Sequence, residues 1–424
     1  MKKLLCVIIC TALIIGIFSS CARKPANNQT DNTSQNSEDN QTQIELYNLN
    51  AIDPEFITSN TVFAFNLFKK LNSEDANKNI FISPLSISTA LTMTYNGAGS
   101  TTAEAMAKAL GYTGMELSDI NSNYKNLLVY LNNVDPKVTL NISNSIWFRK
   151  GEIIKEEFLQ RNKEIFKAYI EQLDFSEPGA ADVINNWIKE STQGKIDKMV
   201  DSPIPKDVVM YLINAIYFKG DWTVQFDKNQ TFAGSFYTED GKKHEVQMMK
   251  RKGEAEYGEI DGAKAIKLPY GSGKFSMYCI LPPEGTSIKS YIEELNAEKW
   301  EKLKKSVGKK SDVIINLPRF KMEYGVKKLN DCLISLGMEE AFSSDADFSG
   351  IEDNIFISRV LHKAVIEVNE EGSEAAAATV VEMTKAALLE PVEFIADRPF
   401  IFIIADEVTG TLIFMGVYVT PPEM

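Results

Sequence analysis

The sequence has few of the residues on which enzyme active sites and metal sites depend. It contains only two histidines, His244 and His362, and five cysteines, three of which lie in the first 21 residues. A catalytic triad built on histidine needs a nucleophile and an acid that meet it in space, and no motif indicates one. Cys279 and Cys332 lack the paired spacing of a structural zinc site, so we interpret them as separate buried thiols and leave a disulfide between them open. We therefore expect no enzyme activity, no metal and no cofactor.

The sequence also has fewer basic residues than acidic ones. Lysine and arginine together number 45 against 58 acidic residues, which gives a net charge of −13. An acidic surface repels nucleic-acid phosphates, so nucleic acid is not expected as a partner. The hydrophobic share of 44% and the charged share of 24% are ordinary for a globular protein. From residue 55 to residue 424 the chain has no linker-like break, repeat or low-complexity stretch, so we expect one domain there.

The one long apolar run of the chain lies at its N-terminus. Residues 4–18 are too few for a comfortable transmembrane helix; two lysines precede them, and two serines and Cys21 follow. This order is typical of an export signal, and residues 18–21 resemble the box of a bacterial lipoprotein. We expect residues 1–20 to be the signal and Cys21 to carry a lipid, with a plain secretory signal as the alternative. Either way, the mature protein would act outside the cytoplasm.

The segment after Cys21 has almost no apolar residues. Residues 22–43 are rich in Asn, Gln, Ser, Thr and Asp. Such a composition cannot bury enough surface to offset the entropy lost on ordering. We therefore predict that residues 21–54 are a flexible tether, which would hold the folded body near a membrane surface.

The body mixes helical and strand-like patterns without regular alternation, which favours the α+β class over a doubly wound sheet. Ser83 and Pro84 mark a helix start, as an N-cap residue and a first-turn proline. Predicted helices cover 59–71, a segment from 84 onward, 180–191 and 326–336. Predicted strands cover 138–148, 208–218, 275–281, 313–317 and 400–419.

Seven stretches of the body form a recognisable set, and they extend over almost its whole length. They are residues 79–87 (NIFISPLSI), 214–222 (NAIYFKGDW), 317–320 (LPRF), 345–350 (DADFSG), 360–364 (VLHKA), 367–379 (EVNEEGSEAAAAT), and a closing signature in 397–403 (DRPFIFI) and 409–416 (TGTLIFMG). Together they resemble the serpin family of protease inhibitors and occur in the order that the family has, which makes chance a negligible explanation. The resemblance implies a single-domain α+β fold with three β-sheets, about nine helices and an exposed reactive-centre loop at about 370–391.

The loop also has a pattern that can be interpreted without the family. Alternate side chains of a strand face opposite sides, and one alternate set is uncharged and grows from small to large, while the other carries Glu374 and Glu382. This is the pattern of a strand that enters a sheet, although the alanine run alone would also suit a helix. Because ordering a residue costs ~1–2 kcal/mol and a hydrogen bond returns only ~0.5–1.5 kcal/mol, insertion also needs apolar burial and a strained, metastable native sheet. The uncharged set is Ser373, Ala375, Ala377, Thr379, Val381 and Met383.

The resemblance also implies roles for individual residues. Trp222 and Arg319 would form the breach, the point where a strand enters, with Arg319 paired to Glu370. Counting fourteen residues from Gly372 in the family's register places the reactive bond at Ala386–Ala387, with Lys385 as the alternative specificity residue. The hinge would comprise Glu370, Gly372, Ser373, Ala375, Ala377 and Thr379, and a buried hydrogen-bond cluster called the shutter would comprise Ser83, Ser86, Asn214 and His362.

The expected function follows from the family. A serine protease would cut the loop and form a covalent acyl-enzyme, and insertion of the loop would then trap it. A small residue before the cut suits elastase-like or subtilisin-like proteases, whereas Lys385 would suit a trypsin-like one. We expect a monomeric suicide inhibitor that acts outside the cytoplasm. The alternatives are a non-inhibitory serpin that binds or carries a ligand, and an inhibitor of cysteine proteases.

Overall fold

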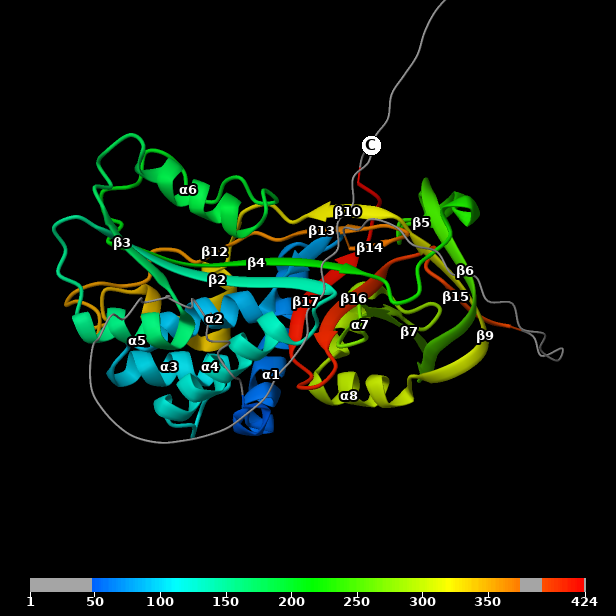
Figure 1. Ribbon diagram of the computed structural model, residues 1–424, viewed down its shortest axis with the longest axis horizontal. Coiled ribbons are helices and arrows are strands. Elements are labelled where there is room, and N and C mark those ends of the chain that lie inside the picture. Colours follow the sequence, from blue (N-terminus) through cyan, green and yellow to red (C-terminus); the bar gives the residue numbers. More distant parts are fainter. Residues whose placement is uncertain (1–47, 374–390, 423–424) are drawn as a thin grey trace, which may run out of the picture. The chain divides into compact units, whose positions relative to one another are not determined.

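The computed structural model describes residues 48–373 and 391–422 (Figure 1). Within these ranges, no helix combines the length and the apolar character that a membrane crossing needs. The predicted export signal and Cys21 lie outside the described residues. So do the later hinge residues and the predicted reactive bond, namely Ala375, Ala377, Thr379, Lys385, Ala386 and Ala387.

The folded body begins earlier than the predicted boundary at residue 55. A short 3-10 helix, η1 (Leu49–Ala51), precedes the first α-helix, and the side chain of Asp53 caps that helix by accepting a hydrogen bond from Glu55 N (2.8 Å). Ile52 is buried in the core. The tether assigned to 21–54 is therefore too long at its C-terminal end, because its last residues carry a helix cap and a core side chain.

Nine α-helices are present in the described part of the chain, in agreement with the expected number. The α2 helix begins as predicted, because Ser83 Oγ accepts a hydrogen bond from Ser86 N (3.1 Å) and Pro84 occupies the first turn. Figure 1 shows α2 to α5 on one side of the strands β2 and β4, and α6 on the other side. The helices are α1 (Pro54–Glu74), α2 (Pro84–Tyr95), α3 (Ser100–Leu110), α4 (Leu117–Asn133), α5 (Glu156–Phe166), α6 (Ala180–Ser191), α7 (Ile288–Glu294), α8 (Ala297–Ser306) and α9 (Asn330–Leu333).

The strands form one nine-stranded sheet, one four-stranded sheet and two short pairs. The nine-stranded sheet has the order β1-β17-β16-β8-β7-β6-β9-β15, with β5 paired to β6; the four-stranded sheet has the order β14-β4-β2-β3, and the pairs are β10–β13 and β11–β12. The strands are β1 (Ile80–Ile82), β2 (Val138–Arg149), β3 (Tyr169–Leu173), β4 (Met210–Asp221), β5 (Phe232–Tyr237), β6 (Lys243–Ile260), β7 (Ala263–Tyr270), β8 (Phe275–Leu281), β9 (Gly308–Pro318), β10 (Phe320–Glu323), β11 (Lys327–Lys328), β12 (Leu361–His362), β13 (Val365–Val368), β14 (Gly372–Ser373), β15 (Val392–Ile395), β16 (Phe400–Asp406) and β17 (Leu412–Tyr418).

Two sequence-based assignments differ from the structure. The apolar run 400–419 is a hairpin of β16 and β17, and the chain reverses between them with Gly410 at a φ of 81°. The helix predicted over 326–336 begins only at Asn330, because Lys327 and Lys328 pair with β12 instead. The first run contains a turn that divides it into two strands, and the second segment loses its first residues to a strand partner more than thirty positions away.

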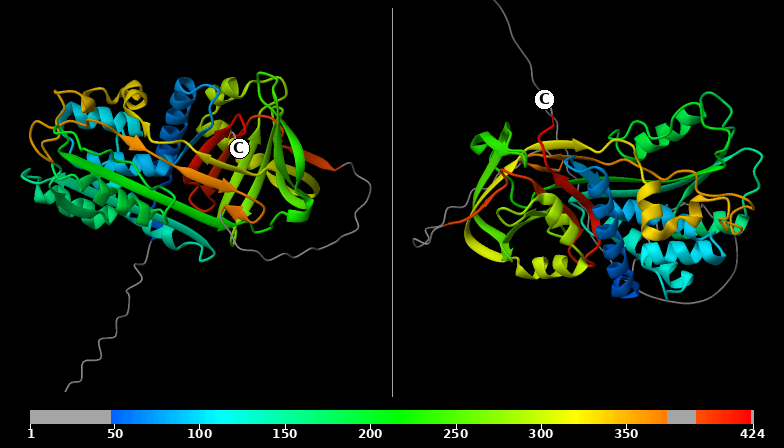
Figure 2. Two further views of the ribbon diagram at one scale, coloured as in Figure 1. Left: turned by 90° about the horizontal axis from the view of Figure 1, so that it is seen from above. Right: turned by 180° about the vertical axis from the view of Figure 1, so that it is seen from behind.

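The expected fold has three sheets, whereas hydrogen bonding in the described residues defines four sets of strands. In the central sheet, β4 and the run β12–β13 lie side by side without a hydrogen-bond ladder between them, so the sheet β14-β4-β2-β3 and the two short pairs count as separate sets (Figure 2). The α+β class and the single folded body are as predicted. The two isolated thiols, Cys279 and Cys332, are buried and free, so they form no disulfide.

Alternate residues of the central strands face two different cores. Ile216 of β4 and Ile366 of β13 belong to the main hydrophobic core. Ile213 of β4 and Val365 of β13 instead pack in a smaller cluster with residues of α6. Because successive side chains of a strand point to opposite faces, the even-numbered residues of both strands face the main core and the odd-numbered ones face α6.

Candidate functional site

The central sheet contains a slot between β4 and the run β12–β13. No ladder joins their facing edges in the ranges that the structure describes. A cavity of about 180 Å³ lies in the part of the slot that Asn214 of β4 and His362 of β12 line. A smaller cavity of about 30 Å³ lies further along the slot, where Ile216 of β4 and Ile366 of β13 line it. Because unpaired backbone groups of inner strands are costly, the slot is a ready partner for one additional strand.

The chain turns back toward β4 at the head of this slot. After β13, Asn369 N donates a hydrogen bond to Gly372 O (3.0 Å), and the Asn369 side chain accepts hydrogen bonds from Glu371 N (3.0 Å) and Gly372 N (3.2 Å). Gly372 has a φ of 151°, and a Cβ there would lie 2.2 Å from Gly220 O. The turn therefore requires glycine at this position.

The predicted hinge residues Gly372 and Ser373 form the short strand β14 beside β4. Gly372 lies opposite Asp221 and Ser373 opposite Gly220, in antiparallel register. Ser373 is buried, and its Oγ lies 2.8 Å from the hydroxyl oxygen of Tyr270, on the side of the main core. Ser373 therefore faces inward, as its place in the uncharged set of the loop predicts.

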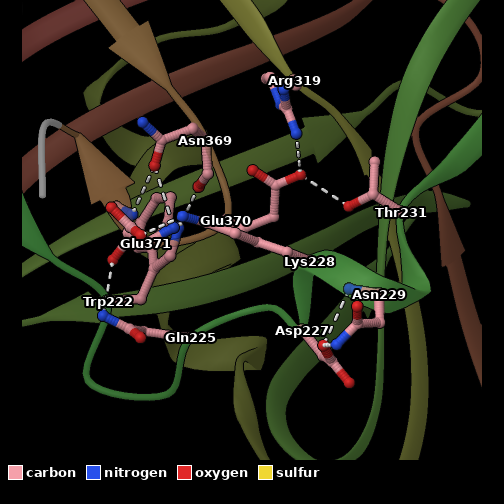
Figure 3. A network of polar contacts seen from close by, with 11 residues as sticks. Trp222, Gln225, Asp227, Lys228, Asn229, Thr231, Arg319, Asn369, Glu370 and Glu371 are labelled. Carbon is pink, nitrogen blue, oxygen red and sulfur yellow. Dashed lines mark hydrogen bonds and ion pairs between the residues drawn. The ribbon is translucent and has the colours of Figure 1, made fainter. Parts of the chain in front are cut away.

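Glu370 is held by an ion pair with Arg319 (Figure 3). The Glu370 side chain is 2% exposed and that of Arg319 is 46% exposed, and Thr231 Oγ1 donates a second hydrogen bond to the carboxylate (2.6 Å). Burial alone would raise the pKa of Glu370, but the hydrogen bonds from Arg319 and Thr231 outweigh it and hold that pKa below its ordinary value. The Glu370 carboxylate of this ion pair is therefore buried. A fully solvated ion pair would contribute little to stability, but this pair is not of that kind.

The breach tryptophan ties the hinge to the sheet. Trp222 is 3% exposed and stacks on Tyr270 with ring centroids 4.3 Å apart. Its Nε1 donates to Asn369 O (2.9 Å), and its backbone N donates to Glu371 O (2.8 Å). Lys228 adds an ion pair to the Glu371 carboxylate. These contacts hold the turn at the head of the slot, and Figure 3 shows most of them converging on 369–371.

The four predicted shutter residues meet in the structure, deep in the sheet. Ser83 N donates to His362 Nε2 (3.1 Å), and Ser83 Oγ donates to Ile413 O (2.7 Å). Ser86 Oγ donates to Asn214 O (3.4 Å). Ser86, Asn214 and His362 also line the larger cavity, so the cluster borders the slot.

Burial keeps the shutter histidine neutral. Desolvation lowers the pKa of His362 from its ordinary value of 6.5 to about 3. Since Nε2 accepts a hydrogen bond from Ser83, the single ring proton of the neutral imidazole lies on Nδ1. The histidine can therefore offer one donor toward a further partner.

Several residues of the site were missed by the sequence reasoning. Tyr270 packs against both Trp222 and Ser373, Thr231 binds Glu370, and Asn144 Oδ1 accepts a hydrogen bond from Asn214 Nδ2 (2.7 Å). The predicted strand 138–148 carries several polar residues, including Asn141 as well as Asn144, so its sequence alone did not single out Asn144. Nothing local marked Tyr270 or Thr231.

Comparisons with known proteins agree with this geometry. The family model described as serpin (serine protease inhibitor) matches residues 58–421. The chain is 37% identical to the leukocyte elastase inhibitor of Bos taurus over 370 residues, which cover 84% of this chain and 97% of the relative. The native-state structure of the thermophilic serpin tengpin is 37% identical with a TM-score of 0.78, and the match covers 87% of this chain and 95% of that one.

A structure of thyroxine-binding globulin in complex with thyroxine is also similar, at 30% identity and a TM-score of 0.78, with 87% of this chain and 99% of that chain covered. The fold is thus shared by relatives whose names describe an elastase inhibitor and a thyroxine-binding protein. The family model extends over the described fold from α1 to the residues after β17, and the slot, hinge and shutter all lie inside it. On this evidence, the chain belongs to the serpin family.

Proposed function

We propose that the protein is a suicide inhibitor of extracellular serine proteases, which traps the acyl-enzyme by inserting its cleaved loop into the slot of the central sheet. The observation that carries this proposal is the hinge strand β14. Gly372 and Ser373 already pair with the head of β4, and β14 runs antiparallel to β4 along the slot. A cut further along the loop would free the chain to continue this pairing.

The energetics of the slot support the same proposal. A strand placed between β4 and the run β12–β13 is hydrogen bonded on both sides, whereas an edge strand is bonded on one side only. It would also fill the two cavities with the small uncharged side chains of its inward face. These gains together oppose the entropy lost when the loop is ordered.

The proposed reactive bond is Ala386–Ala387, with Lys385 as the alternative specificity residue. An alanine before the cut suits the shallow pocket of an elastase-like or subtilisin-like protease, and the similarity to a leukocyte elastase inhibitor supports this class. The uncharged inward set of the loop favours inhibition over a carrier role, because a charged or bulky inward side chain would oppose insertion.

The test is to mix the protein with pancreatic elastase and with subtilisin. We expect a covalent complex that survives denaturing electrophoresis, and mass spectrometry should find a released C-terminal fragment that begins at Ala387. A fragment that begins at Ala386 would move the reactive bond to Lys385. Cleavage without any complex, and without a gain in thermal stability after cleavage, would instead favour a non-inhibitory binding protein.

We also propose that the protein is held at a cell surface by a lipid on Cys21. The support is the order of basic, apolar and small residues before this cysteine, and the polar stretch after it. In a bacterial host, the wild type is expected in the membrane fraction, and the Cys21→Ala variant in the medium or periplasm. The Cys6→Ala variant, altered inside the signal, is the matched control and should stay in the membrane fraction. Equal release of the wild type would contradict the anchor.

A further inference from the structure

The cavity of about 180 Å³ in the slot extends from the main core to the solvent. Its inner end is lined by buried residues such as Leu91 and Phe348, and its outer end by exposed ones such as Asn354. Phe356 also lines the outer end, and this aromatic side chain is 51% exposed. The cavity is therefore open to solvent at the end that Phe356 lines.

The lining and the volume of the cavity limit what it can hold. Most of the lining side chains are apolar, including Ile87, Leu91 and Leu212, so the burial of apolar surface favours an apolar occupant. An apolar cavity of ~150 Å³ holds one molecule of benzene. A cavity of about 180 Å³ thus has room for one aromatic ring that carries a small fused ring or substituent.

One buried polar atom of the lining lacks a partner. Asn214 is 9% exposed, and its Oδ1 accepts no hydrogen bond from the described part of the chain. Asn144 Nδ2 donates to Phe166 O (2.7 Å), so Asn144 Oδ1 is the atom that accepts from Asn214 Nδ2 (2.7 Å). Asn144 lies on β2, which flanks β4 on the side opposite the slot. The Asn214 oxygen is therefore directed toward the slot.

The buried hydroxyl groups of the lining are already bonded. Ser86 Oγ donates to Asn214 O (3.4 Å), and Thr94 Oγ1 donates to Ala90 O (3.1 Å). Neither hydroxyl proton is thus available to Asn214 Oδ1. A buried acceptor without a donor is costly, so a ligand that brings a donor gains more here than one without. The inner end of the cavity therefore selects for an N–H or O–H group.

The outer end of the cavity carries no net charge, because the exposed residues Asp207 and Arg359 have opposite signs. We propose that this part of the slot is a binding site for a small neutral aromatic molecule with one hydrogen-bond donor, of the size of indole. Its rings would occupy the apolar cavity, and its donor would bond to Asn214 Oδ1. The bound molecule would also occupy space that an inserted strand needs and so slow insertion; this last effect rests on the proposed function.

The first test compares indole with indene, which has the same fused-ring shape but no N–H. Binding to the full-length protein is measured by saturation-transfer NMR and by the rise of the thermal unfolding midpoint with ligand concentration. We expect indole to bind about fivefold more tightly than indene, which is the effect of one neutral hydrogen bond. Partition onto an unspecific apolar surface would instead favour indene, because indene is the more apolar molecule.

A pair of variants locates the site. Ala90 of α2 lines the cavity, so the larger side chain of Ala90→Leu would fill part of it and weaken indole binding about tenfold. Ala105→Leu makes the same change on α3, away from the cavity, and should bind indole as the wild type does. Equal binding of indole and indene to the wild type, or undiminished binding to Ala90→Leu, would overturn the site. If Ala90→Leu does not fold, the comparison of the two ligands decides by itself.

A measurement of trapping separates the binding site from the function on which its last effect rests. With pancreatic elastase, the ratio of covalent complex to cleaved inhibitor should fall at least about twofold at saturating indole, and it should not change in Ala90→Leu. An unchanged ratio in the wild type would overturn the placement of the ligand in the slot. If the wild type traps the protease and indole does not bind, the inference is wrong and the function stands. If indole binds as expected and no protease is trapped, the proposed function fails and the binding site stands.

Discussion

The Ser373→Arg variant is expected to be cut by its target protease as fast as the wild type but to trap at least tenfold less of it. Ser373 is buried opposite Gly220, and its Oγ contacts the hydroxyl of Tyr270. An arginine at this place would have to bury a guanidinium without an acid partner, which costs several kcal/mol, and ~1.4 kcal/mol on the insertion barrier already corresponds to tenfold in rate. Hydrolysis of the acyl-enzyme would then precede insertion.

The measurement is the ratio of covalent complex to cleaved inhibitor on a denaturing gel. Ser373→Ala is the first control, and it should still trap because a small side chain fits the inward face. Glu374→Arg is the second, because it introduces the same side chain one residue later. Glu374 belongs to the alternate set of the loop sequence that already carries charge, so an arginine there is expected to be tolerated. Equal loss of trapping in both arginine variants would show that charge, and not the face of the strand, decides the outcome.

Local sequence signals predicted the fold where the structure depends on local physics. Ser83 and Pro84 marked the start of α2, and the boundaries of α6 and β8 agree with the predicted ranges. These predictions succeeded because helix caps and the period of apolar residues depend on residues that are close in the sequence. The strand β11 escaped prediction because its pairing with β12 joins residues more than thirty positions apart. The tether boundary failed because Ile52 is buried only by the tertiary fold.

The candidate site also depends on contacts between residues that are far apart in the sequence, which local signals do not predict. The family pattern identified Ser86, Asn214 and His362 as candidates, and the structure places them around one cavity. Their geometry depends on Asn144, whose amide orients Asn214 from seventy residues away. No periodicity or spacing can report such an orientation, because it is set by the packing of β2 against β4 and α5. Asn214 Oδ1 is buried and has no hydrogen-bond partner, a fact that only the three-dimensional structure reveals.

Lowering the pH from 6.5 to 5 is expected to destabilise the intact protein by about 2 kcal/mol through His362 alone. Burial lowers the pKa of His362 to about 3 in the folded state, whereas in the unfolded chain it returns to its ordinary value of 6.5. Below pH 6.5, His362 therefore binds a proton in the unfolded state but not in the folded state. As a result, the free energy of unfolding falls by ~1.4 kcal/mol per pH unit until the pH approaches the pKa of the folded state. Unfolding midpoints in urea at a series of pH values measure this slope.

The carboxylates whose pKa values the fold lowers affect the stability in a different pH range. Glu370 and Asp75 have lowered pKa values, so their contributions are present above their ordinary values of 4.5 and 3.8 and are lost only below them. The His362→Gln variant keeps an acceptor that Ser83 N can reach but cannot titrate, and its stability should change less between pH 6.5 and 5. The matched His244→Gln variant should keep the slope of the wild type. A slope that survives in His362→Gln would contradict the assignment. A slope that disappears would identify protonation of the shutter as the step by which mild acid weakens the central sheet, because an imidazolium can no longer accept the hydrogen bond that holds Ser83 beside the slot.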